Sequence, residues 1–422
     1  MPPNNSPKRR RGGWPNYRSP HRRRADEEAH AGDLVAPPVL EHELVSDGPV
    51  ETVETQEGLL GLIQELRGAG RFGYDTEFIG EETFYSRFCV VQVSTVDRIT
   101  LIDALAPGID LLPFWELLAD PAVEVMVHAG LQDLEPVERL TGKPPANIFD
   151  TQIAAGFAGQ PYPMSLTKLT SALLEADLGK SSKFSQWDRR PLTDNQKLYA
   201  ANDVRYLLLL RQRIGERLDE LGHADKARAE CEVYSDASAF RVDPLEMKLK
   251  AKGAGKLNRK QQAVVNALLL WRAQEAEARD LPMRTLLEDQ ILVDLAKEPP
   301  DDAKQIQTRK GVPWPVKQDY AQTLVDVVAA ALAGPLPKRR KKYKPLSDEA
   351  QARLDELWDA AQACCGAASI APSLVFTKRE LTAFVRAEAK GKPPAADARM
   401  NSGWRSELLG PVLHAAAEAD PV

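Results

Sequence analysis

The hydrophobic positions in the first half of the chain follow two periods, one typical of helices and one typical of buried strands. The pattern predicts a helix over 58–69, strands over 71–78, 88–94, 99–102 and 123–128, and helices over 131–140 and 194–221. The first helix ends at Gly70, a residue type that commonly follows the last helical turn. Strands that come first and then alternate with helices predict an α/β domain, which we place at residues 47–235.

Beyond Val242 only the helical period remains. The predicted helices cover 258–277, 283–296, 318–332 and 347–364, and two shorter helices follow them. The last long helix begins with Ser347-Asp-Glu, a sequence typical of a helix N-cap. A basic linker bounded by prolines, 335–345, separates two small all-α modules at 246–334 and 346–416.

The composition argues against several classes of protein. No run of about 18 apolar residues is present, which argues against a membrane span. The N-terminus lacks the apolar segment of a secretory signal, and the four cysteines lack the spacing of a disulfide framework. These features predict a cytoplasmic protein with reduced thiols. Residues 1–46 are basic with little apolar periodicity, so a disordered tail is expected.

The distribution of charge matters more than the net charge, which is −6. Basic residues gather in three clusters: the tail, with Lys8–Arg11 and Arg22–Arg24, the segment Lys248–Lys260, and the segment Lys338–Lys344. A single run of this kind is usually a solvated segment. Three runs outside the predicted α/β domain favour contact with a polyanion such as a nucleic acid.

The first candidates for functional residues are acidic residues on the predicted strands and helices. Asp75 and Glu77 lie two residues apart on a strand, so their side chains point to the same side. Alone, such a pair is usually solvent-facing at a sheet edge. Asp133 falls in the first turn of a predicted helix, where a carboxylate by itself only complements the helix dipole.

Tyr199 and Asp203 share one face of the long predicted helix because they are four residues apart. That face continues as an apolar stripe, and an aspartate facing a core needs a partner, either an arginine or a bound cation. Taken together, the four carboxylates suggest a metal site, since hard divalent ions such as Mg²⁺ prefer oxygen ligands. Two ions about 4 Å apart can stabilise the attacking and leaving oxygens of a phosphodiester.

Three strings resemble, in order and spacing, the motifs of the DEDDy exonucleases, a group that includes ribonuclease D, the Werner-type exonuclease and polymerase proofreading domains. They are YDTEF at Tyr74–Phe78, HAGLQDL at His128–Leu134 and YAANDVRYL at Tyr199–Leu207. The segments Phe88–Ser94, Phe149–Ala155 and Leu178–Val204 are similar to ribonuclease D in particular. The two C-terminal modules resemble the HRDC domain that RecQ helicases and ribonuclease D share. The resemblance extends over roughly residues 48–415.

The resemblance implies a ribonuclease-H-like α/β domain with a mixed sheet, followed by two small all-α HRDC-like domains. It implies that two divalent ions, Mg²⁺ or Mn²⁺, are bound by four carboxylates: Asp75, Glu77, Asp133 and Asp203. Tyr199 would position the attacking water. The residues implied near the substrate are Thr76 and Phe78, which would line the pocket of the 3′-terminal nucleotide, and Lys180 and Arg190. Asp150 is interpreted as a helix N-cap and not as a ligand.

The implied activity is that of a 3′→5′ exoribonuclease, which hydrolyses the 3′-terminal phosphodiester and releases nucleoside 5′-monophosphates. The implied partner is RNA with a free 3′ end. Maturation of transfer-RNA 3′ ends is the family expectation, and no protein partner is inferred. Two alternatives are a DNA exonuclease of the Werner type and an inactive RNA-binding scaffold. Tandem HRDC modules without a helicase motif favour RNA, and the complete set of carboxylates with Tyr199 argues against a scaffold.

Two segments depart from the family pattern. Residues 81–86, EETFYS, are more acidic and lack the proline expected after the aromatic pair. The first module has Ile306–Gly311, IQTRKG, where a glycine-led turn is usual, so its nucleic-acid face is expected to differ.

Overall fold

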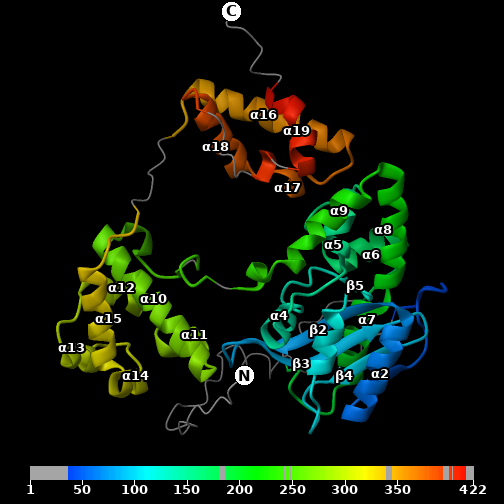
Figure 1. Cartoon of the computed structure of the whole chain (residues 1–422), viewed down its shortest axis with the longest axis horizontal. Coiled ribbons are helices and arrows are strands. Elements are labelled where there is room, and N and C mark those ends of the chain that lie inside the picture. Colours follow the sequence, from blue (N-terminus) through cyan, green and yellow to red (C-terminus); the bar gives the residue numbers. More distant parts are fainter. Residues whose placement is uncertain are drawn as a thin grey trace, which may run out of the picture. The chain divides into compact units, whose positions relative to one another are not determined.

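The computed structural model describes residues 37–179, 186–241, 243–247, 249–338, 345–392, 399–401 and 403–414. The chain divides into two compact units (Figure 1). The sheet unit comprises Gly32–Glu77, Phe88–Arg241 and Tyr343–Val422. The helical unit comprises Phe78–Arg87 and Val242–Lys342. Most of the predicted tail (1–36), most of the basic linker (339–344) and Lys180 lie outside the described residues.

A six-stranded mixed sheet forms the centre of the sheet unit, with the strand order β1-β4-β3-β2-β5-β6. The strands are β1 Val50–Val53, β2 Arg71–Ile79, β3 Arg87–Ser94, β4 Ile99–Asp103, β5 Glu124–Val127 and β6 Ile148–Asp150. β4 is parallel to β1 and antiparallel to β3. The predicted α/β class is therefore confirmed. The sequence did not predict β1 and β6, the two outermost strands of the sheet, which have four and three residues.

Helices follow the strands and pack against them, with α7 on β1 and β4 and α8 on β5. The helices are α2 Gln56–Ala69, α3 Leu112–Leu118, α4 Glu135–Thr141, α5 Thr151–Phe157, α6 Leu166–Leu174, α7 Asp194–Arg205, α8 Leu207–Leu221 and α9 Ala224–Cys231. In α2, the Thr55 side chain caps the first turn and Gly70 ends the helix with a φ of 71°. The left-handed φ explains why glycine stands there.

Several predicted helices have other bounds in the structure. The helix expected over 283–296 is divided into Met283–Leu286 and Asp289–Lys297, and the helix expected over 318–332 begins at Ala321. Two more differ in the sheet unit. The helix expected over 131–140 begins only at Glu135, because Pro136 lacks an N–H and is tolerated only in a first turn. The helix expected over 194–221 breaks at Tyr206 into α7 and α8. At the break the Ser94 hydroxyl donates to the Val204 carbonyl at 2.7 Å. Because this donor comes from the sheet, helical periodicity could not reveal the break.

The C-terminal helices of the sheet unit pack onto the exonuclease-like part, and their apolar residues continue its hydrophobic core. These helices are α16 Asp348–Ala367, α17 Pro372–Val375, α18 Lys378–Glu388 and α19 Gly403–His414. The Ala371 N–H donates to the Gly156 carbonyl at 2.7 Å. The rings of Phe157 and Trp404 meet edge to face at 5.0 Å. The predicted cap of α16 is confirmed, since the Ser347 side chain accepts a hydrogen bond from the Ala350 N–H.

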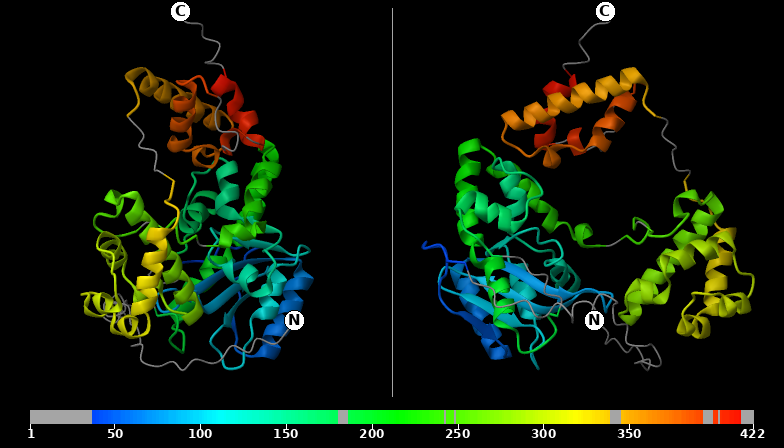
Figure 2. Two further views of the ribbon diagram at one scale, coloured as in Figure 1. Left: turned by 60° about the vertical axis from the view of Figure 1, so that its left-hand side comes forward. Right: turned by 180° about the vertical axis from the view of Figure 1, so that it is seen from behind.

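The helical unit has its own hydrophobic core. Figure 2 shows its helices from two further sides. Its helices are α10 Arg259–Arg279, α11 Met283–Leu286, α12 Asp289–Lys297, α13 Ala303–Thr308, α14 Trp314–Asp319 and α15 Ala321–Ala333. Arg272 on α10 forms a buried ion pair with Asp289 at 2.9 Å. The atypical segment 81–86 belongs to this unit, where Phe84 packs against the core and its N–H donates to the Asp280 carboxylate at 3.2 Å. Among the described helices, none is long and apolar enough to cross a membrane.

We expect Arg405→Ala to lower the free energy of unfolding by about 3 kcal/mol, as is typical when one partner of a buried ion pair is removed. Arg405 is 7% exposed and donates to both Glu230 carboxylate oxygens at 2.5 Å. Urea unfolding measures the loss. Arg228→Ala is the matched control, because Arg228 pairs with Asp225 in solvent and should lose less than about 1 kcal/mol. Equal losses in the two variants would show that the buried pair of Arg405 with Glu230 contributes no more to stability than an exposed one.

Candidate active site

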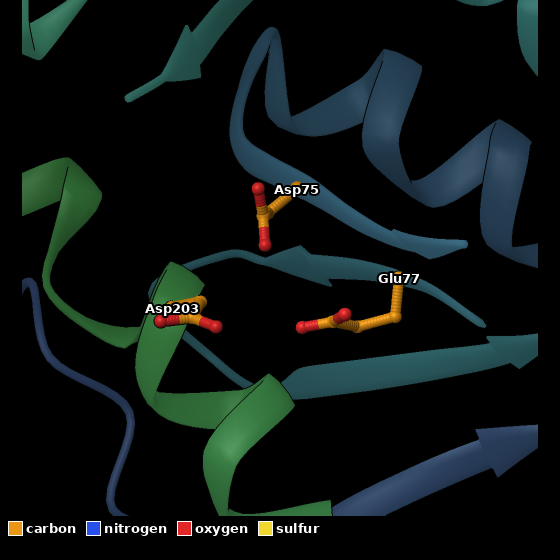
Figure 3. A group of neighbouring side chains, drawn as sticks. All are labelled: Asp75, Glu77 and Asp203. Atoms are coloured by element: carbon orange, nitrogen blue, oxygen red, sulfur yellow. The ribbon is translucent and has the colours of Figure 1, made fainter. Parts of the chain in front are cut away.

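Three acidic side chains come together in the sheet unit. Asp75 and Glu77 come from β2 and Asp203 comes from α7. One carboxylate oxygen of each lies within 4.8 Å of the others, and Figure 3 shows the three side chains grouped between the strand and the helix. No second group of three or more metal-ligand side chains occurs among the residues that the structure describes.

Local structure explains how these three side chains come together. Alternation along β2 turns Asp75 and Glu77 to one side, as the sequence predicted. α7 starts at a capping box in which Thr193 and Gln196 satisfy each other's backbone N–H groups. This cap fixes the start of the helix that carries Asp203 two turns later.

Asp133, the fourth predicted carboxylate, is not in the group of three. Two residues of β2 form hydrogen bonds with it. It lies in the turn before α4, two residues ahead of the helix. The Thr76 hydroxyl donates to its carboxylate, and the Tyr74 hydroxyl donates to its backbone carbonyl at 2.5 Å. The charge of Asp133 nevertheless contributes to raising the pKa of Asp75, Glu77 and Asp203.

Asp150 caps α5, which confirms the prediction, and it also stabilises the turn that leads to Asp133. Its carboxylate accepts hydrogen bonds from the N–H groups of Gln152 at 2.8 Å and Ile153 at 3.3 Å. It accepts a third from the N–H of Ala129 at 3.1 Å. Ala129 has a φ of 60°, a left-handed conformation that is strained for a residue with a Cβ. The sequence indicated the cap but gave no signal for this second contact.

Burial and mutual repulsion raise the pKa of every carboxylate in the site. The Glu77 pKa rises from 4.5 to about 9, first because the group is buried and then because Asp203 and Asp133 are near. Burial raises the Asp203 pKa to about 7. Burial, followed by the charges of its neighbours, raises the pKa of Asp75 well above its usual value, and burial also raises that of Asp133. Crowded buried carboxylates favour either protons or a bound cation.

The partners of these carboxylates are neutral. The Gln92 amide donates to Asp75 at 2.9 Å, the Thr76 hydroxyl donates to Asp133, and the Tyr199 hydroxyl is bonded to Asp203. Within the described part of the chain, no arginine or lysine forms an ion pair with any of the four. The sequence left two possible partners for Asp203, an arginine or a bound cation. Among the described residues, no arginine pairs with Asp203, so that alternative is wrong there. Oxygen ligands without a competing cation fit a hard divalent ion.

Tyr199 lies one turn before Asp203, as its spacing predicted. Burial and the nearby carboxylates, Asp203 first among them, raise the pKa of its phenol. The phenol is therefore protonated at neutral pH and can donate a hydrogen bond. Its ring lies 6.2 Å from the ring of Trp187, which is buried.

The residues predicted near the substrate have varied surroundings. Phe78 is half-buried at the end of β2, whereas Thr76 is buried against Asp133. Arg190 forms a fork with Asp103 at 2.6 and 2.5 Å, and its other N–H groups donate to three backbone carbonyls. These bonds occupy all five guanidinium donors. Substrate binding by Arg190 stays a prediction that requires part of this fork to open.

Comparison with known proteins gives consistent matches along the chain. A 3′-5′ exonuclease domain model matches residues 50–219, and an HRDC domain model matches residues 261–328. A ribonuclease D of Gluconacetobacter diazotrophicus is 35% identical over 365 residues, which is 85% of this chain and 90% of that protein. A ribonuclease D of Granulibacter bethesdensis is 33% identical over 369 residues, 86% of this chain and 91% of that protein.

A solved structure extends the likeness to the fold. The crystal structure of Escherichia coli RNase D, described as an exoribonuclease involved in structured RNA processing, matches with a TM-score of 0.71 at 25% identity. The match covers 89% of this chain and 100% of that one.

The domain match and the mixed sheet define a 3′→5′ exonuclease, which is a hydrolase of phosphodiester bonds. The two relatives named ribonuclease D share at least 33% of their aligned residues with this chain over at least 85% of its length, which identifies the family within this class. The chain belongs to the ribonuclease D family, and the resemblance predicted from the sequence motifs is confirmed.

In EDTA, we expect the free energy of unfolding to fall as the pH rises from 4.5 to about 9, the range between the ordinary and the folded pKa of Glu77. Over this range the folded carboxyl keeps a proton that the unfolded one has lost. Such a group stabilises the fold below its unfolded pKa, and the contribution is lost as the pH passes its folded pKa. Added Mg²⁺ should raise the free energy of unfolding most at about pH 9, where the carboxylates have lost their protons.

Thermal unfolding at about pH 6 and about pH 9, with EDTA or with Mg²⁺, measures this effect of the raised pKa. Glu77→Gln is the control, because its amide does not titrate and the dependence on pH in EDTA should become shallower. An unchanged pH dependence in Glu77→Gln would show that other groups cause it.

Proposed function

We propose that this enzyme hydrolyses the 3′-terminal phosphodiester of RNA and releases nucleoside 5′-monophosphates. The observation that carries the proposal is the group formed by Asp75, Glu77 and Asp203, which is half-buried, crowded and without a basic partner among the described residues. The relatives named ribonuclease D, and the exoribonuclease described from Escherichia coli, support RNA as the substrate.

The carboxylates Asp75, Glu77, Asp133 and Asp203 would hold two divalent ions, Mg²⁺ or Mn²⁺. The residues fit this role because they offer hard oxygen donors and because their raised pKa values show how poorly the site tolerates uncompensated charge. When bound, such ions stabilise the charge that develops on the attacking and leaving oxygens of a phosphodiester.

The neighbouring side chains then orient the reactants. Tyr199 keeps its phenolic proton, so it can donate a hydrogen bond to a water and hold it for attack on the phosphorus. Thr76 fixes the carboxylate of Asp133. Phe78, which follows the acidic pair directly on β2, would contact the terminal nucleotide.

The substrate is proposed to be RNA with a free 3′ end, with transfer-RNA precursors as the family expectation, and the enzyme is proposed to act in the cytoplasm. In the domain division that the sequence predicts, an exonuclease domain covers 47–235, and the helical modules at 246–334 and 346–416 would bind the body of the RNA. The HRDC match supports this role for the first module. We extend the role to the second module from its sequence resemblance.

We expect Asp75→Asn and Asp203→Asn each to abolish cleavage while the fold is retained. Loss of a metal ligand removes several kcal/mol of charge stabilisation, which corresponds to roughly a 10³-fold loss of rate or more. The assay compares RNA and DNA of one sequence with Mg²⁺, with Mn²⁺ and with EDTA, and identifies the mononucleotide products.

Asp225→Asn is the control, because this carboxylate is exposed and should leave the rate unchanged. Near-normal cleavage by either active-site variant would overturn the site assignment. Faster cleavage of DNA would favour the Werner-type alternative, and cleavage of circular RNA as fast as linear RNA would exclude an exonuclease mechanism.

We expect Tyr199→Phe to slow the chemical step by about 10²–10⁴-fold, the usual contribution of a positioned hydrogen-bonding group, while RNA and metal binding change little. Only the hydroxyl is lost, so the packing against Trp187 is kept. Single-turnover kinetics measure the step. Tyr206→Phe is the matched control, since Tyr206 is a buried tyrosine at the end of the same helix whose hydroxyl accepts from the Leu40 N–H. A loss under about threefold would leave Tyr199 as a packing residue.

A further inference from the structure

Gln92 lies in the sheet beside the acidic pair and has no place in the reaction proposed above. It comes from β3, the neighbour of β2 in the sheet, and is fully buried. Its Nε2 donates to the Asp75 carboxylate at 2.9 Å. Gln92 is the one side chain among the described residues that donates a hydrogen bond to this carboxylate.

The other end of the same amide is unsatisfied. The Gln92 Oε1 atom is buried and has no hydrogen-bond partner in the described part of the chain. A buried orphan carbonyl costs free energy, so a structural role alone would be better served by an apolar side chain of the same length. The unpaired Oε1 atom therefore indicates that the hydrogen bond from Nε2 to Asp75 has a function that outweighs this cost.

A neutral donor suits a carboxylate that must keep its charge for a metal. A lysine or arginine at this position would neutralise Asp75 and compete with a cation, whereas an amide orients the carboxylate and leaves its charge in place. Partners that orient metal ligands in this way typically contribute about 10–100-fold to metal affinity or activity.

We propose that Gln92 is a positioning residue that fixes the Asp75 carboxylate for metal binding through its Nε2–H···O bond. The inference rests on the proposed role of Asp75 as a metal ligand. Gln92 touches neither substrate nor reacting atoms in this proposal, so its loss should change metal affinity and kcat but not the KM for RNA.

The test is a Mn²⁺ titration of the full chain without RNA, in which electron paramagnetic resonance measures the free ion. Gln92→Met keeps the length and the apolar packing and removes the donor. It should bind Mn²⁺ about 10–100-fold more weakly, with a lower kcat that added Mn²⁺ restores and with an unchanged KM for RNA.

Thr100→Val is the matched control. Thr100 is also buried in the sheet, on β4, and its hydroxyl also lacks a partner among the described residues. Its hydroxyl forms no hydrogen bond with an acidic side chain among the described residues, so its removal should leave Mn²⁺ affinity unchanged.

Gln92→Lys provides a second route if Gln92→Met does not fold. Its ammonium would pair with Asp75, so the fold should persist in EDTA while Mn²⁺ affinity falls by more than about 100-fold, beyond the range for loss of an orienting partner. Wild-type Mn²⁺ affinity in either variant would overturn the role of Gln92. Failure of the wild-type protein to bind Mn²⁺ would instead overturn the proposed metal site, and this inference with it.

Discussion

Repulsion among crowded, half-buried carboxylates is the constraint on which the rest of the proposed active site depends. Asp75, Glu77 and Asp203 bring three acidic groups within 4.8 Å, and Asp133 adds a fourth charge nearby. Burial removes the water that would screen them, so each resists ionisation and the pKa values rise. Such a group costs stability unless protons or cations neutralise it, and a protein retains that cost where the charge serves a function.

The surrounding fold holds the charges in place without neutralising them. Thr76 and Tyr74 on β2 hold the side chain and the backbone of Asp133. Asp150 secures the strained residue Ala129 that leads into the same turn. The side chains that form hydrogen bonds with these carboxylates in the described structure are neutral hydroxyl and amide groups. Rigid elements and satisfied supporting groups are the general means of holding a site to the geometry that catalysis needs.

Each of the two units has its own hydrophobic core, and the chemistry belongs to one of them. In the sheet unit, the C-terminal helices share the core of the exonuclease domain, and Arg405 and Trp404 secure their contact with it. In the helical unit, residues 81–86 pack against α10, although they follow β2 directly in the chain. The unusual sequence of this segment thus coincides with a packing role inside the helical unit.

The sequence by itself determined the class of fold, most strands and helices, the family, and which acidic residues to examine, because local periodicity and motif spacing are properties of the chain alone. The helix break at Tyr206 and the fork of Arg190 with Asp103 were decided by the tertiary structure. So were the neutral partner Gln92 and the second contact of Asp150. Each of these features depends on groups far apart in sequence, whereas Pro136 fixes the start of α4 locally. Only the tertiary structure brings such groups within hydrogen-bonding distance, and burial then sets how strongly they interact.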